Sequence, residues 1–156
     1  MAITNQERVN KAMELLKAGL GPFVERELEN KYKTKAHEQA VLFVGDDPQL
    51  LKKRPRDWDV AALLKLTLEA WTPVFKVTLG PAERALLQEL RDTRNKWAHQ
   101  EPFSSDDAYR AIDTVGRLLN AVSAPEQGAE IEKARMDLLR VTFDERARSE
   151  RRKGAG

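Results

Sequence analysis

The sequence predicts an all-α protein, an up-and-down bundle of about five to seven helices. Apolar residues recur every three or four positions along most of the 156-residue chain, which is the spacing that puts them on one face of a helix. Short Gly-Pro, Ser and Asp signals separate these segments, and such residues end one helix and start the next. One domain is expected, because most domains have about 100 to 150 residues.

The first helix is predicted to begin at Thr4, because Thr4 and Glu7 have the spacing of a capping box. The run GLGP at residues 19–22 predicts a break, since glycine favours helix ends and proline the first turn of a new helix. A second short helix then contains Phe23, Val24 and Leu28.

Residues 29–56 are the least regular part, and a short helix followed by an irregular loop is expected there. The apolar run AVLFV at residues 40–44 leaves a strand over residues 41–44 as the alternative. Nothing else in the chain offers that strand a partner.

Asp57 or Asp59 is predicted to cap the next helix, which continues to Gly80 with a bend at Pro73. Gly80 and Pro81 then repeat the stop-and-start signal, so a new helix is expected from Pro81 through residue 99.

Pro102 prevents that helix from continuing. Ser104 and Asp107 cap the following helix, and Pro125 starts the last one. The helical domain is expected to span residues 1–145. Residues 146–156, which begin RARSERRK, are expected to form a basic tail or a linker to a downstream module.

The composition excludes several classes of site. The chain has no cysteine, which excludes disulfides and thiolate chemistry, and only two histidines, so neither a metal site nor another cofactor is expected. No apolar run reaches the roughly 18 residues of a membrane span, and the start lacks the pattern of a secretion signal. A cytoplasmic protein is therefore expected. The formal net charge of +2 leaves a nucleic-acid partner open.

The predicted helix over residues 81–99 has two different faces. At about 100° per residue, one stripe faces the core. It contains Leu86, Leu90, Thr93 and Trp97. The opposite band contains Arg84, Gln88, Arg91, Asn95 and His99. Arg94 is predicted to lie between the two faces.

The outward band suits phosphate binding and proton transfer. Guanidinium groups bind phosphate oxygens with paired donors, and imidazole exchanges a proton near neutral pH. The alternative is an ordinary polar outer face, with a histidine that the helix C-terminus favours whatever its function. His99 is therefore a candidate catalytic residue, but its position on the outward face of the helix does not by itself establish a catalytic role.

The run RNKWAH, from Arg94 to His99, resembles the Arg-Asn-x-x-x-His signature of the HEPN superfamily. The segments TNQERVNKAMELLKAGLGPFVERE, WDVAALLKLTLEAWTPVFKVTLGPAER and RNKWAHQEPFSSDDAYRAID resemble the branch of HEPN domains named for a nuclear messenger-RNA surveillance endoribonuclease. This resemblance covers most of the chain and implies the HEPN-like helical bundle.

The resemblance implies a metal-independent endoribonuclease that acts as a homodimer. In that case Arg94 would stabilise the scissile phosphate, His99 would transfer protons, and Asn95 would orient His99 or the phosphate. It also implies that the domain is often the N-terminal module of a larger ATPase or helicase-like protein in bacterial genome or phage defence. The basic, glycine-containing end of the chain agrees with that expectation.

Arg84 and Arg91 are added from the helical wheel as RNA-binding or dimer-rim residues, and the alternative is that both are solvated surface arginines. Trp97 is predicted to be a core anchor rather than a platform for stacking bases, and His37 a surface residue. The alternative function is a non-catalytic dimerisation or docking module of a larger ATPase or helicase-like protein.

Overall fold

The computed structural model describes residues 3–155, which contain six α-helices and no strand. The helices are α1 (Asn5–Tyr32), α2 (Ala36–Phe43), α3 (Val60–Glu69), α4 (Pro81–Ala98), α5 (Ser105–Ala121) and α6 (Pro125–Ala155). Short 3₁₀ turns lie between them: η1 (Lys33–Lys35), η2 (Pro48–Lys52), η3 (Pro55–Asp57) and η4 (Phe75–Val77). The predicted all-α bundle is confirmed.

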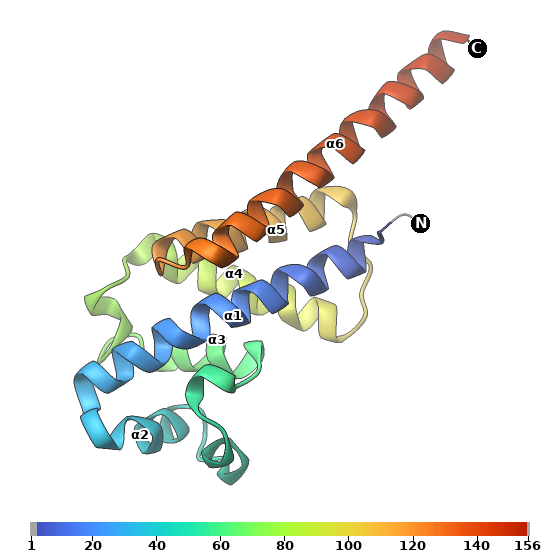
Figure 1. Cartoon of the computed structure of the whole chain (residues 1–156). Coiled ribbons are helices and arrows are strands. Elements are labelled where there is room, and N and C mark those ends of the chain that lie inside the picture. Colours follow the sequence, from blue (N-terminus) through green and yellow to red (C-terminus); the bar gives the residue numbers. More distant parts are fainter. Residues whose placement is uncertain (1–2, 156) are drawn as a thin grey trace.

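Helix α1 is the central element, because it contacts each of the other five α-helices and the η3 turn (Figure 1). Helix α5 packs against α1, α4 and α6, and α3 packs against α1 and α4. The core between them contains fully buried side chains from α1, α3, α4 and α5 and from the connecting turns. The largest of these side chains include Trp58, Phe75, Leu16, Leu63, Leu87, Leu90, Ile112 and Leu118.

The predicted helix starts are confirmed by their caps. The Thr4 hydroxyl accepts a hydrogen bond from the Glu7 amide at 3.0 Å, which starts α1. Asp59, rather than Asp57, caps α3 by accepting from the Ala62 amide at 2.9 Å. The other predicted starts, Gly80-Pro81, Ser104 with Asp107, and Pro125, open α4, α5 and α6.

The predicted break at residues 19–22 is wrong, because α1 continues through Pro22 to Tyr32. The two glycines instead allow close packing. A Cβ on Gly19 would overlap the side chain of Leu119 in α5, and one on Gly21 would lie 2.5 Å from the Arg56 carbonyl oxygen. Contacts along the whole length of α1 therefore outweigh the hydrogen bond that Pro22 cannot make.

Helix α3 ends at Glu69, whereas the sequence predicted a bent helix to Gly80. The proline at position 73 explains the difference, because its ring would clash with the carbonyl of Glu69 in a continuing helix. The alternative strand over residues 41–44 is also wrong. Residues 36–43 form α2, whose inner side buries Ala40 and Val41.

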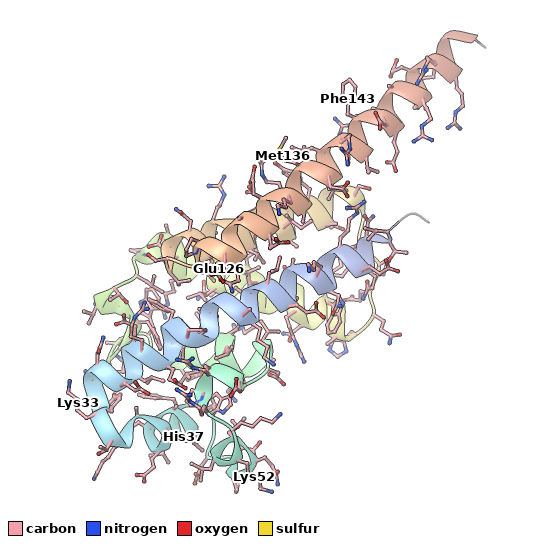
Figure 2. All side chains as sticks on the ribbon, viewed as in Figure 1. Lys33, His37, Lys52, Glu126, Met136 and Phe143 are labelled. Carbon is pink, nitrogen blue, oxygen red and sulfur yellow. The ribbon has the colours of Figure 1, made fainter. Side chains whose placement is uncertain are left out.

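Helix α6 is longer than the bundle that it packs on. It buries Ile131 and Leu138 against the bundle, and beyond them it projects as a single helix that includes residues 146–155 (Figure 1). Met136 and Phe143 lie on its outward side, 54% and 72% exposed (Figure 2). Across residues 3–155, no helix has the length and apolar character needed to cross a membrane.

Candidate functional site

Helix α4 presents the predicted outward band to solvent. Arg84, Gln88, Arg91, Asn95 and His99 are all exposed. The buried side is centred on Leu87 and Leu90, whereas Leu86 and Trp97 of the predicted stripe are only half-buried. The centre of the buried side of α4 differs from the predicted stripe because α4 packs between α3 and α5 and also touches α1. Asp92 is a further exposed residue on this helix.

Arg94 follows Leu87 by two helical turns and therefore points to nearly the same side. It is half-buried, and its Nε is sealed from solvent with no hydrogen-bond partner among residues 3–155. No carboxylate in that range lies within ion-pair distance of it. A guanidinium held in this way keeps an uncompensated charge, which an anion such as phosphate would neutralise.

This lack of a partner distinguishes α4 from the rest of the bundle, where arginines are mostly ion-paired. The pairs include Arg8 with Asp137, Arg56 with Glu25, Arg110 with Glu89, Arg117 with Asp113 and Arg135 with Glu132. The three arginines of α4 make no ion pair among the residues that the structure describes. Outside the projecting end of α6, where Arg146, Arg148, Arg151 and Arg152 also make no ion pair among the described residues, the arginines without an ion pair are therefore those of α4.

His99 is the C-cap residue of α4, and its amide donates to the Asn95 carbonyl at 3.0 Å. The chain then turns through Gln100, which has a left-handed φ of 56°. The Gln100 amide donates to the Trp97 carbonyl and the Glu101 amide to the Lys96 carbonyl, as in a Schellman motif. This turn fixes the main chain on both sides of the exposed imidazole.

Two neighbouring helices hold the end of α4. From α1, Gln6 Nε2 donates to the Trp97 carbonyl at 3.4 Å and Asn5 Nδ2 to the Phe103 carbonyl at 3.1 Å. From α5, Asp107 pairs with Lys96 at 3.4 Å. Hydrogen bonds from the Ser104 main chain and side chain, and then from Lys96, lower the pKa of Asp107, so its charge is favoured.

The structure brings together only part of the predicted site. Arg94, Asn95 and His99 lie within the last turn and a half of α4 and its cap. Measured along the axis, Arg91 is about 12 Å from His99 and Arg84 about 22 Å from it. Arg84 lies 5.7 Å from the centre of the Trp71 ring, at the opposite end of the helix. Neither arginine lies in the last turn of α4 with His99.

His37 is not the unpartnered surface residue that the sequence predicted. It is half-buried, its Nε2 lies 2.9 Å from the Leu50 carbonyl oxygen, and its ring packs beside Trp58. It holds the η2 turn against α2, at the end of the molecule opposite the N-terminus (Figure 2). Helix α1, about 40 Å long, separates this end from the Gln6 contact to α4. His37 therefore cannot act beside His99.

A groove of about 610 Å³ adjoins the site and was not predicted. It is lined by Gln6, Glu7, Asn10, Trp97, Ala98 and Gln100. Its walls come from α1 and from the end of α4, which are 91 positions apart at the Gln6 contact. No local pattern in the sequence could have joined them.

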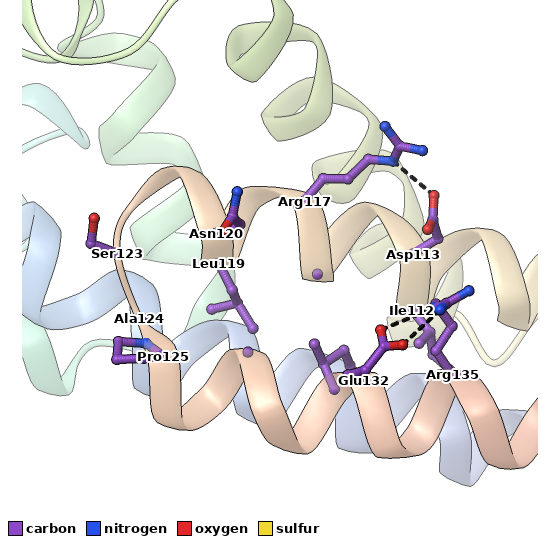
Figure 3. A pocket seen from close by; sticks show the side chains of 13 residues that line it. Ile112, Asp113, Arg117, Leu119, Asn120, Ser123, Ala124, Pro125, Glu132 and Arg135 are labelled. Carbon is purple, nitrogen blue, oxygen red and sulfur yellow. Dashed lines mark hydrogen bonds and ion pairs between the residues drawn. The ribbon is translucent and has the colours of Figure 1, made fainter.

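A second groove, of about 740 Å³, lies between α5 and α6 (Figure 3). Its rim charges neutralise one another, since Asp113 pairs with Arg117 and Glu132 with Arg135. Its lining includes none of the residues of the run RNKWAH. It therefore lacks the free cation and the histidine that distinguish the end of α4.

Among residues 3–155, no group of three or more His, Asp or Glu side chains is arranged to hold a metal ion. In comparisons with known proteins, the family model described as Swt1-like HEPN matches residues 11–123. This match includes α4, α5 and the run RNKWAH. No curated protein and no solved structure matches the chain.

Proposed function

Since the chain belongs to the Swt1-like HEPN family, we propose that it is a metal-independent endoribonuclease domain that acts as a homodimer. One observation carries the proposal. Arg94, half-buried and without an ion pair among residues 3–155, lies five residues before the exposed His99, at the end of a helix that two neighbouring helices hold. The pair supplies a fixed cation for phosphate and a group for proton transfer.

In the proposed reaction, a base takes the proton of the ribose 2′-hydroxyl, and the 2′-oxygen attacks phosphorus. The bond from phosphorus to the 5′-oxygen breaks, and an acid protonates that oxygen. The products are a 2′,3′-cyclic phosphate and a free 5′-hydroxyl. Arg94 stabilises the charge on the phosphorane, and Asn95 orients His99 or the phosphate from one turn before it.

The reaction needs both a base and an acid, but each chain supplies one histidine at the site. His37 is held at the far end of α1, so the second histidine comes from a second chain. In a two-fold dimer that pairs the outward faces of α4, His99 and His99 of the partner subunit serve as base and acid. The same pairing would place Arg84 and Arg91 at the rim, where they could contact RNA or the partner subunit.

The test is cleavage of labelled single-stranded RNA by the purified chain in EDTA. Fragments should carry 5′-hydroxyls that polynucleotide kinase labels directly. His99→Ala and Arg94→Ala should each lower the rate by about 10²- to 10⁴-fold, the usual contribution of a placed acid or base. The control is Arg117→Ala, which removes an exposed arginine of α5 and should leave the rate unchanged. Cleavage that EDTA abolishes, or that survives His99→Ala, would contradict the mechanism.

Mixed dimers test the shared site. If each dimer needs both histidines, an equal mixture of wild-type and His99→Ala chains leaves about one quarter of the dimers fully competent. At constant total protein, the rate should therefore fall to about one quarter of the wild-type rate. A fall to one half would mean that each chain acts alone.

A non-catalytic docking module is the second candidate. Its basis is a group of large apolar side chains that α6 exposes to solvent. Met136, Leu139 and Phe143 share its outward side and continue along the projecting part of the helix. This function predicts self-association or partner binding that Phe143→Lys disrupts, with no cleavage of RNA by any form of the dimer.

The branch of HEPN domains that the sequence resembles often forms the N-terminal module of larger ATPase or helicase-like proteins in bacterial genome or phage defence, and we include this context in the proposal. Bacteria that express the complete open reading frame should resist phage infection, whereas those with His99→Ala should not. Equal plaque numbers for the two would contradict a nuclease-dependent defence role.

A further inference from the structure

We infer that the groove between α1 and the end of α4 is a nucleobase subsite, with Trp97 as its stacking platform; this rests on the proposed function. The groove, of about 610 Å³, is large enough for a base and its ribose. Both neighbours of His99 in the chain, Ala98 and Gln100, line it. Since adjacent Cα atoms lie about 3.8 Å apart, the main chain of His99 lies at the groove edge.

The lining residues indicate what kind of group binds there. Of the residues that the structure describes, no lysine or arginine lines the groove, and Glu7 is the one with an ionisable side chain there. A phosphate would be repelled, so the phosphate belongs to Arg94 and the groove takes an uncharged part of the ligand. Gln6, Asn10 and Gln100 add amide donors and acceptors around Trp97, which suits a flat ring with a hydrogen-bonding edge.

Trp97 differs from the other two tryptophans of the chain. Trp58 and Trp71 are 1% and 6% exposed, whereas Trp97 is half-buried and lines the groove. The Gln6 amide holds its main chain, so the indole is attached to a fixed turn of the helix. A partly exposed indole of this kind stacks a base at little conformational cost.

Arg94 links the two subsites. On a helix surface, a residue meets those three and four positions later, which here are Trp97 and Ala98. Both line the groove. A base stacked on Trp97 would therefore have its phosphate on the side of Arg94, and the nucleotide chain would continue around the end of α4 to His99.

Glu7 provides the expected base preference. Its carboxylate is exposed and makes no ion pair among residues 3–155, so it is available as an acceptor. Carboxylates accept hydrogen bonds from amino and ring N–H groups. Guanine offers two such donors side by side, and uracil has no amino group. Guanine should therefore bind most tightly and uracil least.

The test is binding by the His99→Ala chain, in which cleavage does not interfere. Four single-stranded oligonucleotides that differ at one base serve as probes, and both fluorescence anisotropy and quenching of tryptophan emission are recorded. Trp97→Leu should weaken binding about tenfold, whereas Trp97→Phe, which retains a stacking ring, should bind nearly as the parent. Glu7→Gln should reduce the preference for guanine over uracil.

A Trp97→Leu chain that binds with unchanged affinity, and whose circular dichroism shows it folded, would overturn the subsite even if the wild type cleaves RNA. Binding that depends on Trp97 in a wild type that never cleaves would retain the subsite and reject the nuclease. If Trp97→Leu unfolds, quenching of tryptophan emission in the parent is compared with that in Trp97→Phe, which keeps only Trp58 and Trp71. Quenching that Trp97→Phe removes supports the subsite, and binding without quenching overturns it.

Discussion

Gln6 and Trp97 join the first turn of α1 to the last turn of α4, through a hydrogen bond of 3.4 Å from the Gln6 side chain to the Trp97 carbonyl. The neighbouring Asn5 side chain reaches the Phe103 carbonyl beyond the end of α4. The candidate site is therefore held by residues that precede the family match, which begins at residue 11. The geometry around His99 depends on the start of the chain.

Asn5→Ala should loosen the end of α4 without unfolding the bundle. A net loss of about 1 kcal/mol for a partly buried hydrogen bond corresponds to about fivefold faster local opening. Hydrogen exchange should therefore accelerate at the amides of residues 97–103 and stay unchanged in α3, and RNA cleavage should decrease. The matched control is Asn30→Ala, an exposed position near the other end of α1. Equal exchange in the two variants would contradict the anchoring role.

Arg94→Met should keep or improve stability while it removes cleavage. The change retains the apolar stem and deletes a buried Nε that has no hydrogen-bond partner within residues 3–155, so the free energy of unfolding should rise by up to about 1 kcal/mol. Urea denaturation measures this. A clear loss of stability would show that Arg94 has a structural partner and would weaken its role at phosphate.

Arg8→Met is the matched comparison, because Arg8 is buried and ion-paired with Asp137 at 2.9 Å. This change should lower the free energy of unfolding by about 1 to 2 kcal/mol. This is less than the roughly 3 to 5 kcal/mol typical of breaking a fully buried pair, because Asp137 is partly exposed and keeps its bond to Arg140. Cleavage should be unaffected at temperatures where the variant is folded.

The helix starts could be predicted because a cap is a local feature. Thr4, Asp59 and Ser104 bond to amides three residues later, so the sequence contains both partners. The predicted break in α1 was wrong because the roles of Gly19 and Gly21 depend on Leu119 and Arg56, which are far away in the chain.

The candidate site was predictable in part for the same reason. Asn95 and His99 lie on one face of one helix, and the helical period alone places them in solvent. The unpaired Nε of Arg94 and the groove at Trp97 depend on how α1, α3 and α5 pack around α4. That packing determines how deeply each side chain is buried and which residues surround it. Helical periodicity carries no information about the packing between helices.

Glu25→Gln should destabilise the bundle in a pH-dependent manner. Burial raises the pKa of this carboxyl, but hydrogen bonds from Arg54 and Arg56 outweigh burial and leave the pKa below its usual value. A depressed pKa in the folded state contributes stability above the unfolded pKa, and that contribution is lost as the pH falls through the folded value.

The loss in Glu25→Gln should be about 1 to 2 kcal/mol at pH 7 and should shrink towards zero in acid, where the wild-type carboxyl is also neutral. Urea denaturation from pH 7 downwards measures both proteins. The control is Glu38→Gln, an exposed position of α2. A difference between wild type and Glu25→Gln that stays constant down to the lowest pH would contradict the role assigned to this ion pair.

Gly21→Ala and Gly128→Ala should change stability in opposite directions, although both glycines are in helices. A Cβ at Gly21 would lie 2.5 Å from the main-chain oxygen of Arg56, and the hydrogen bond from the Arg56 guanidinium to Glu25 holds that segment. Because the main chain at Arg56 cannot move away without breaking these contacts, the free energy of unfolding of the variant should be lower by about 1 to 3 kcal/mol. At Gly128 nothing lies within 4 Å of the added carbon, and alanine should stabilise α6 by about 0.5 to 1 kcal/mol. Thermal denaturation of both variants checks the pair, and a Gly21→Ala protein as stable as the wild type would mean that η3 does not pack against α1 this closely.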